Sequence, residues 1–186
     1  MKLVVGISGA TGAIYGLRLL ETLKKISGVE THLTITNSAI KTIELEMGLT
    51  EDHVKSLATY YHDVENLAAP IASGSFMVDG MVVVPCSMKT LAGIASGYSD
   101  NLLLRAADVT IKERRPLILV TRETPLSPIH LENMLKLARC GVTILPAMPA
   151  FYHKPKTIDD LVNQIVGKIL DKLGLEHKLY RRWTQS

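Results

Sequence analysis

Short apolar runs alternate along this chain with stretches of helical periodicity, and this alternation restricts its fold more than any other feature. The apolar runs predict strands at residues 2–8, 30–36, 80–84, 116–121 and 142–145. The stretches between and after them predict helices near residues 12–26, 37–48, 88–96, 99–113, 127–139 and 158–173. Strands that alternate with helices are typical of a mostly parallel sheet covered by helices on both faces. No linker or repeat interrupts the series, so we expect a single α/β domain over residues 1–186.

An arginine and a glutamate follow directly after the predicted strand 116–121. In open α/β sheets, ligands bind just beyond the carboxyl ends of the parallel strands. A fixed cation at this edge, Arg122, favours an anionic ligand, and the neighbouring carboxyl group of Glu123 could move protons. The alternative is a surface salt bridge between the two side chains, and the pair alone favours neither interpretation.

The turn Gly-Ile-Ser-Gly-Ala-Thr-Gly-Ala at residues 6–13 joins the first strand to the first helix. Small residues there let backbone amides approach phosphate oxygens at a helix N-terminus. The spacing is GxxGxxG, which departs from the dinucleotide fingerprint GxGxxG, and Thr36-Asn37-Ser38 stands where that fingerprint expects an acid. A mononucleotide phosphate therefore fits better than NAD. The alternative is a tight turn that only packs the helix on the sheet.

A third strand end carries hydroxyl groups, in Pro85-Cys86-Ser87-Met88-Lys89-Thr90. Taken alone, Ser87 is more typical of a helix cap than of a ligand site. Hydroxyl groups and free helix amides also bind phosphate, however, and the carboxyl ends of parallel strands meet at one edge of the sheet. The convergence of these signals predicts a ligand site at that edge.

Composition limits the partners. The formal net charge is +3 and the basic residues form no run interleaved with aromatic residues, so we expect small anions as ligands and no nucleic acid. Hydrophobic residues make up 47% of the chain, which predicts a sheet buried on both faces together with an oligomer interface. Cys86 and Cys140 form no CxxC pair, which indicates reduced thiols and a cytoplasmic protein. The scattered histidines predict no metal site, and no apolar stretch is long enough for a membrane span.

Six motifs in this order resemble those of the UbiX/Pad1 flavin prenyltransferases, and the resemblance runs from residue 3 to about 183. The motifs are the turn at residues 6–13, Pro-Cys-Ser-Met-Lys-Thr, Lys-Glu-Arg-Arg-Pro-Leu, Arg-Glu-Thr-Pro-Leu, His-Leu-Glu-Asn-Met and Pro-Ala-Phe-Tyr-His. The resemblance implies a Rossmann-like, flavodoxin-type α/β/α sandwich and a dodecamer. It also implies that a dimethylallyl group from dimethylallyl phosphate is joined to N5 and C6 of reduced FMN. The prenylated FMN would serve UbiD-type decarboxylases, and no metal is implied.

The resemblance also assigns residues. FMN contacts are implied for Gly9, Ala10, Thr11, Thr36, Ser87, Met88, Lys89, Thr90 and Arg122. The prenyl phosphate site is implied for Tyr152, Lys168, Lys112 and Glu123, and an active-site acid for Glu46. Trp183 resembles the tryptophan of a C-terminal lid, so residues 176–186 are expected to form a tail or lid. From the residues alone, Tyr152 is equally compatible with simple packing, and an acid such as Glu46 on a helix is usually solvated.

The implied reaction requires the departure of a phosphate, which needs a cationic cluster or a proton donor. Lys112, Arg122 and Lys168 could supply the charge and Tyr152 a hydrogen bond, while Glu46, Glu123 or the released phosphate could act as base. One rival is a flavin-dependent decarboxylase of the oligomeric cysteine-decarboxylase class, whose members typically carry a catalytic histidine and a Pro-Ala-Ser-Ala-Asn-Thr-like motif. The other rival is a non-catalytic FMN carrier, which would not need the second anion site.

Overall fold

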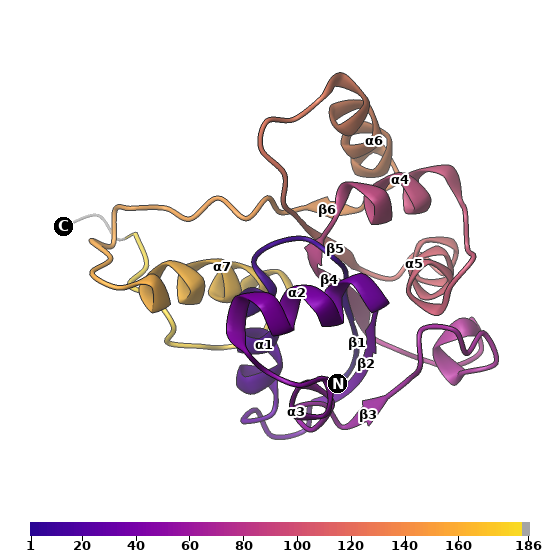
Figure 1. Cartoon of the computed structure of the whole chain (residues 1–186), viewed down its shortest axis with the longest axis horizontal. Coiled ribbons are helices and arrows are strands. Elements are labelled where there is room, and N and C mark those ends of the chain that lie inside the picture. The colour runs from indigo at the N-terminus through magenta and orange to yellow at the C-terminus, as the bar shows by residue number, and fades with distance from the viewer. Residues whose placement is uncertain (184–186) are drawn as a thin grey trace.

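The computed structural model describes residues 1–183 and contains one parallel sheet in the order β3-β2-β1-β4-β5-β6 (Figure 1). The strands are β1 (Lys2–Ile7), β2 (Glu30–Ile35), β3 (Tyr60–Tyr61), β4 (Gly80–Cys86), β5 (Leu117–Thr121) and β6 (Thr143–Ile144). The helices are α1 (Ala13–Leu23), α2 (Asn37–Met47), α3 (Glu51–Lys55), α4 (Met88–Ser96), α5 (Leu102–Lys112), α6 (Pro128–Arg139) and α7 (Ile158–Lys172), with a 3₁₀ turn at Pro70–Ala72. The predicted strands and long helices are confirmed to within a few residues, and β3 was not predicted.

This strand order reverses direction between β1 and β4, since β2 lies on one side of β1 and β4 on the other. The loops after β1 and β4 therefore diverge at the carboxyl edge, where doubly wound sheets bind their ligands. The order confirms a Rossmann-like fold. It places the switch point between the glycine-rich turn (residues 6–13) and the Ser87 loop (residues 85–90).

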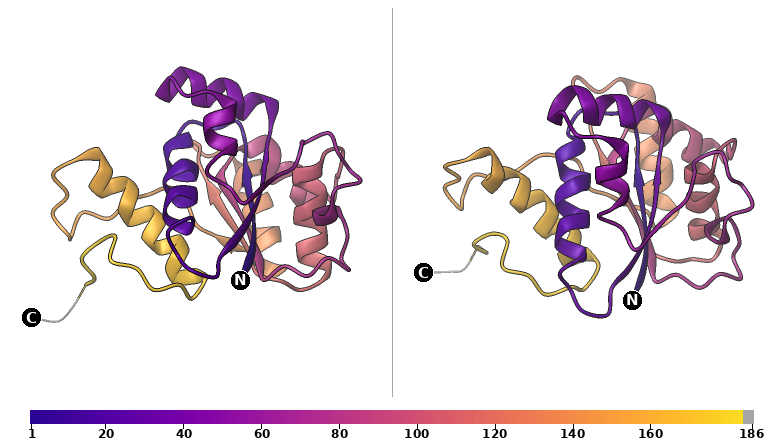
Figure 2. Two further views of the ribbon diagram at one scale, coloured as in Figure 1. Left: turned by 90° about the horizontal axis from the view of Figure 1, so that it is seen from below. Right: turned by 60° about the horizontal axis from the view of Figure 1, so that its bottom comes forward.

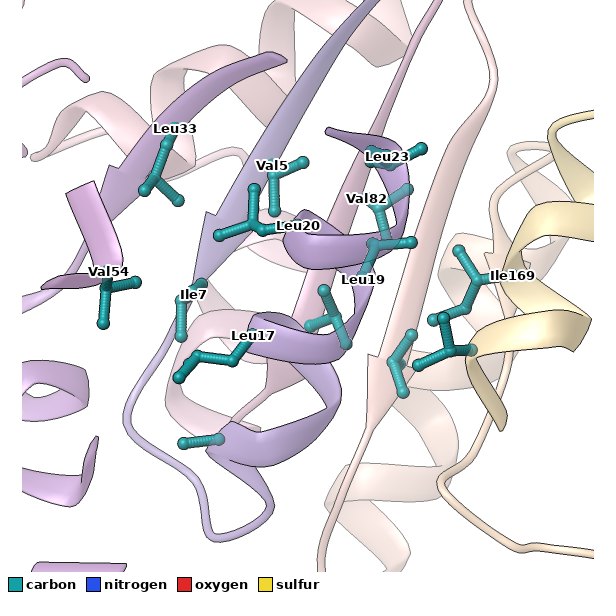
Figure 3. Close-up of a cluster of buried hydrophobic side chains, with 14 of the residues drawn as sticks. Val5, Ile7, Leu17, Leu19, Leu20, Leu23, Leu33, Val54, Val82 and Ile169 are labelled. Carbon is teal, nitrogen blue, oxygen red and sulfur yellow. The ribbon is translucent and has the colours of Figure 1, made fainter. Parts of the chain in front are cut away.

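Two apolar cores, one on each face of the sheet, make the three-layer α/β/α sandwich (Figure 2). Alternate strand residues face opposite cores: Val5 and Val82 contribute to the core under α1, α2 and α7, whereas Val4 and Val83 contribute to the core under α4, α5 and α6. Figure 3 shows leucines of α1 and Ile169 of α7 packed over the first of these faces. Burial on both faces explains why the strands read as continuous apolar runs.

A glycine sets how closely α1 approaches the sheet. A Cβ atom at Gly16 would lie 2.5 Å from the carbonyl oxygen of Val84, so only glycine permits this contact between α1 and β4. The N-terminus of α1 is thereby held close to the end of β4, which brings the glycine-rich turn toward the Ser87 loop.

The chain between β6 and α7 leaves the body of the domain as an extended arm. Backbone pairing with β5 continues as far as Ala147, whose N–H donates to the carbonyl of Thr121 at 3.0 Å. Residues 148–157 then extend away from the sheet, α7 returns to pack on α1, and the tail after α7 runs back toward the arm (Figures 1 and 2). Residues 184–186 of the predicted tail lie outside the described residues. Among residues 1–183, no helix has the length and apolar character needed to cross a membrane.

Candidate active site

Residues from four segments, those after β2, β3 and β4 and the start of α5, surround a cavity of about 350 Å³ at the carboxyl ends of the strands. Four residues that carry hydroxyl groups, Thr36, Ser38, Ser87 and Thr90, line it together with Lys89. Asp100 and Asn101, at the start of α5, close the opposite wall. This part of the predicted FMN site is therefore brought together within one chain.

Buried hydrogen bonds fix the Ser87 loop to the glycine-rich turn. Ser8 is fully buried, and its hydroxyl donates to the carbonyl of Pro85 at 2.9 Å and accepts from the N–H of Ser87 at 2.8 Å. The Ser87 hydroxyl in turn accepts from the N–H of Thr90 at 3.2 Å and donates to the Thr90 hydroxyl at 3.1 Å. Ser8 was not predicted as a site residue. Its position directly after a buried strand was the available signal.

The N-terminus of α1 is closed by a side chain of the protein itself. Gly12 precedes the helix with φ of 93° and supplies no capping side chain. The carboxylate of Glu46, from α2, accepts from the N–H of Gly12 at 3.0 and 3.2 Å and from that of Ala13 at 3.1 Å. In this structure the carboxylate of Glu46 is the anion at these two amides, and binding of a phosphate at the turn stays a prediction. Glu46 is exposed, but unlike most acids on a helix surface its carboxylate accepts hydrogen bonds from the protein backbone.

The N-termini of α2 and α4 remain open to an anion. Their caps, Thr36 and Ser87, each accept a hydrogen bond from the third helical residue. The first two amides of each helix, those of Asn37, Ser38, Met88 and Lys89, donate to no acceptor within residues 1–183. Unpaired helix amides, four residues with hydroxyl groups and Lys89 together offer donors suited to an anion, while Glu65 and Asp100 also line the cavity. The residues present fit the phosphate of a mononucleotide at this edge.

Gly9 permits the close packing that shapes this edge. A Cβ atom at Gly9 would lie 2.3 Å from the hydroxyl oxygen and 2.6 Å from the Cβ of Ser38. The turn Gly9-Ala10-Thr11 thus lies directly against the start of α2. Any side chain at Gly9 would displace one wall of the cavity.

Arg122 and Glu123 do not form an ion pair with each other. The backbone N–H of Arg122 donates to the carbonyl of Cys86 at 3.2 Å, which ties the end of β5 to the end of β4. Glu123 accepts from the N–H of Thr124 at 3.1 Å. No carboxylate pairs with the guanidinium group of Arg122 among the described residues. Burial raises the pKa of the Tyr15 hydroxyl, and the nearby Arg122 charge opposes that rise. The surface salt bridge considered from sequence is therefore absent, and Arg122 remains available to an anion.

Tyr152 of the arm and Trp183 of the tail form a second cluster, and the tail is hydrogen-bonded to α7, the helix that carries Lys168. The rings of Tyr152 and Trp183 meet edge to face with centroids 5.4 Å apart. Lys168 lies in the second half of α7, with its ammonium group 4.0 Å from the carboxylate of Asp171. The aromatic pair and the cation of α7 are the residue types predicted for a prenyl phosphate site, and Asp171 connects them because it contacts both Lys168 and the tail.

Lys112 lies near the amino ends of the strands, opposite to the cavity at their carboxyl ends. It is the last residue of α5, it pairs with Glu113, and its ammonium group lies close to Gly74. The chain then enters β5 at its amino end, whereas the cavity lies at the carboxyl ends. Within one chain, Lys112 therefore does not lie near Arg122 at the carboxyl ends of the strands. The part of the chain that the structure describes also contains no group of three or more histidine, cysteine, aspartate or glutamate side chains suited to hold a metal ion.

The fold and the cavity at its switch point define a flavoprotein of the doubly wound α/β class, and residues 1–170 match the Flavoprotein family. A probable UbiX-like flavin prenyltransferase of Streptomyces sp. (strain D7) is 58% identical over 184 residues, which cover 99% of this chain and 92% of the relative. The chain belongs to the UbiX family of flavin prenyltransferases.

Solved structures agree with this assignment. A dodecameric FMN-dependent UbiX-like decarboxylase from Escherichia coli O157:H7 is 55% identical with a TM-score of 0.98, and each chain is covered completely. AnUbiX (PadA1), solved in complex with FMN and dimethylallyl pyrophosphate, is 50% identical with a TM-score of 0.97, over 100% of this chain and 98% of that one. The peptidyl-cysteine decarboxylase EpiD shares only the fold, at 17% identity and a TM-score of 0.67, over 92% of this chain and 97% of its own.

Proposed function

We propose that this chain joins a dimethylallyl group from dimethylallyl phosphate to N5 and C6 of reduced FMN. The product, prenylated FMN, would serve UbiD-type decarboxylases. The proposal is supported by two separate groups of residues suited to anions, one around the cavity at the carboxyl ends of the strands and one formed by Tyr152 and Trp183 with Lys168 on α7. An FMN carrier needs only the first. A decarboxylase of the cysteine type needs a histidine, and none lines the strand-edge cavity.

The strand-edge cavity binds FMN in this proposal. The open amides of α2 and α4, with Thr36, Ser87 and Thr90, receive the phosphate, and Lys89 neutralises its charge. Gly9, Ala10, Thr11 and Arg122 border the flavin from the neighbouring loops. The bound flavin supplies the nucleophilic ring atoms, while the chain supplies orientation and charge.

The second cluster binds the prenyl donor. Lys168 neutralises charge on the departing phosphate, and the Tyr152 hydroxyl donates to it. The edge-to-face pair of Tyr152 and Trp183 presents aromatic surface to the allylic group, which develops positive charge as the phosphate leaves. Closure at flavin C6 releases a proton, for which Glu46, Glu123 and the released phosphate are the candidate acceptors.

We also propose that a complete site forms between copies of the chain, in a dodecamer. Within one chain Lys112 lies at the sheet edge opposite to the cavity, so its predicted contribution to a phosphate site requires a second copy. Large apolar side chains are exposed on α6 and the arm, among them Leu131, Leu135 and Phe151. Such exposure is typical of a subunit that buries further surface on assembly. The unpaired thiols of Cys86 and Cys140 favour the cytoplasm as its location.

The test is an anaerobic reaction of the protein with reduced FMN and a prenyl donor. We expect phosphate release from dimethylallyl monophosphate and a flavin product that is heavier by one five-carbon unit. Dimethylallyl diphosphate in a parallel reaction decides between the two donors. A flavin of unchanged mass with both donors would refute the proposal, and carbon dioxide release from a cysteine-terminated peptide would favour the decarboxylase instead. Addition of the product to a UbiD-type apo-decarboxylase tests the recipient separately.

A further inference from the structure

The tail that follows α7 folds back onto this helix, and its polar groups converge on one carboxylate. Asp171 accepts a hydrogen bond from the His177 ring at 3.0 Å, from the Tyr180 hydroxyl at 2.7 Å and from the Arg182 guanidinium group at 2.6 Å. These donors come from six, nine and eleven residues further along the chain. Figure 2 shows the tail returning beside α7 toward the arm. One aspartate therefore gathers three tail side chains.

Side-chain packing also holds the tail against α7, without any contribution from charge. A Cβ atom at Gly167 would lie 2.5 Å from two ring carbons of Tyr180 and 2.7 Å from a ring carbon of His177. Glycine inside a helix costs about 1 kcal/mol relative to alanine. The buried Gly167 thus leaves the space on α7 that the two tail rings fill.

The hydrogen bonds define the protonation states of the cluster. The N–H of Leu179 donates to Nδ1 of His177 at 3.2 Å, so Nε2 carries the ring proton and donates it to Asp171. Burial opposes ionisation of Asp171, but the hydrogen bonds from Arg182, Tyr180 and His177 outweigh it and lower the pKa of the carboxyl group to about 2. Burial and the bond to Asp171 raise the pKa of Tyr180 to about 12. The cluster is therefore fully formed at neutral pH.

The far end of the docked tail carries Trp183. Its ring lies edge to face on Tyr152 of the arm, and it is otherwise 75% exposed. Arg182, which precedes it, is held by Asp171. Lys168 stands one turn before Asp171 on the same face of α7. Asp171 thus lies between the tail that positions Trp183 and the cation predicted to bind the prenyl phosphate.

We propose that Asp171 is a positioning residue for the prenyl-donor site: its carboxylate docks the tail on α7 and thereby places Trp183 against Tyr152. The proposal deepens the function proposed above and rests on it for its kinetic part. Its structural part, the docking of the tail, can be tested without catalysis because Trp183 is the only tryptophan of the chain.

The first test reads tail docking from tryptophan fluorescence. In the full-length protein, Asp171→Asn should lower the anisotropy of the Trp183 emission, because the ring gains freedom of motion when it leaves Tyr152. Gly167→Ala should produce the same change by displacing the two rings, with no charge altered and a helix of higher intrinsic propensity. Glu176→Gln is the matched control, since this exposed tail carboxyl group has no hydrogen bond or ion pair within residues 1–183. It should leave the emission unchanged.

The second test measures the KM for dimethylallyl phosphate. The direction in which this KM changes separates a positioning role of Asp171 from a purely electrostatic one. Removing a negative charge beside Lys168 would by itself favour phosphate and lower the KM for dimethylallyl phosphate. Loss of positioning should instead raise this KM about tenfold, the equivalent of ~1.4 kcal/mol, in both Asp171→Asn and Gly167→Ala. The dissociation constant of FMN should stay unchanged in both variants, because the strand-edge cavity is not touched.

Unchanged anisotropy of the Trp183 emission in a folded Asp171→Asn protein would overturn the docking role, and a lowered or unchanged KM would overturn the positioning role. Thermal unfolding of each variant shows whether it is folded, and Gly167→Ala carries the test if Asp171→Asn does not fold. If the wild-type protein releases no phosphate, the proposed prenyl transfer fails, whereas the fluorescence result still decides the docking of the tail.

Discussion

Replacement of Glu46 by glutamine tests whether this acid caps α1, as the structure indicates. Both carboxylate oxygens contact the N–H of Gly12, and one also accepts from the N–H of Ala13. Glutamine keeps the length of the side chain, but it has one acceptor oxygen and no charge, so its NH₂ group must face a donor or turn away. Because Glu46 is exposed, we take the loss of the charge at the helix N-terminus and the weakened hydrogen bonds together as about 1 kcal/mol. For a chain of this size, that corresponds to a fall of roughly 2–4 °C in the thermal midpoint.

Glu44→Gln is the matched control for this prediction. Glu44 lies two residues earlier on α2 and is exposed, and no hydrogen bond or ion pair of its side chain occurs among residues 1–183. Its replacement should change stability by less than about 0.5 kcal/mol. The assay is thermal unfolding of both variants and the wild type at one protein concentration, without ligand. Equal midpoints for Glu46→Gln and Glu44→Gln would refute the capping role. A loss of prenylation at an unchanged midpoint would assign Glu46 to the chemistry instead.

Three further predictions concern a proton carrier, a pH dependence and a thiol. Glu123→Gln should retain FMN but slow prenylation, measured by flavin titration and phosphate release; loss of FMN binding would make Glu123 structural. Burial, and to a smaller extent the nearby His32, lower the pKa of His62 below 6.5. Below pH 6.5 the unfolded chain therefore binds more protons than the folded protein, and the stability of the fold should fall as the pH drops through 6.5. His62→Gln should flatten that part of a plot of thermal midpoint against pH, and an unaltered slope would contradict the assignment. Burial raises the pKa of the Cys86 thiol, so iodoacetamide should modify Cys86 only after denaturation, as peptide mass analysis would show.

The sequence predicted most of the fold because burial on both faces of a parallel sheet leaves a strong apolar pattern. It did not predict β3, since Tyr60–Tyr61 is only two residues long and lies in a polar, irregular segment at the edge of the sheet. The convergence of the candidate residues was predictable for a geometric reason, because parallel strands bring the residues after their carboxyl ends to one side of the sheet. Thr36, Ser87 and Arg122 accordingly lie where their order along the chain indicates.

Other parts of the site depend on tertiary contacts that sequence spacing does not carry. The pairing of Glu46 with the N-terminus of α1 requires α2 to lie across that helix, and on sequence alone Glu46 resembles the exposed Glu44. The order of the motifs along the chain likewise does not predict that Lys112 lies far from the cavity. Motifs show that residues occur together in a family, but they do not show which copy of the chain contributes each residue to a site.

Asp171 shows that one more signal was present in the sequence. The acids Asp159 and Asp160 lie in the first turn of α7, where the helix dipole favours them. Asp171 lies in its last turn, where the exposed carbonyl groups oppose a negative charge. An acid at the unfavourable end of a helix needs donors from elsewhere, and the following residues supply His177, Tyr180 and Arg182. Lys168 offsets this local conflict with the dipole in part, and the docked tail supplies the three hydrogen bonds. The same three donors that stabilise the Asp171 carboxylate therefore also bring Trp183 to Tyr152, so a single carboxylate links the stability of the helix end to the geometry of the proposed donor site.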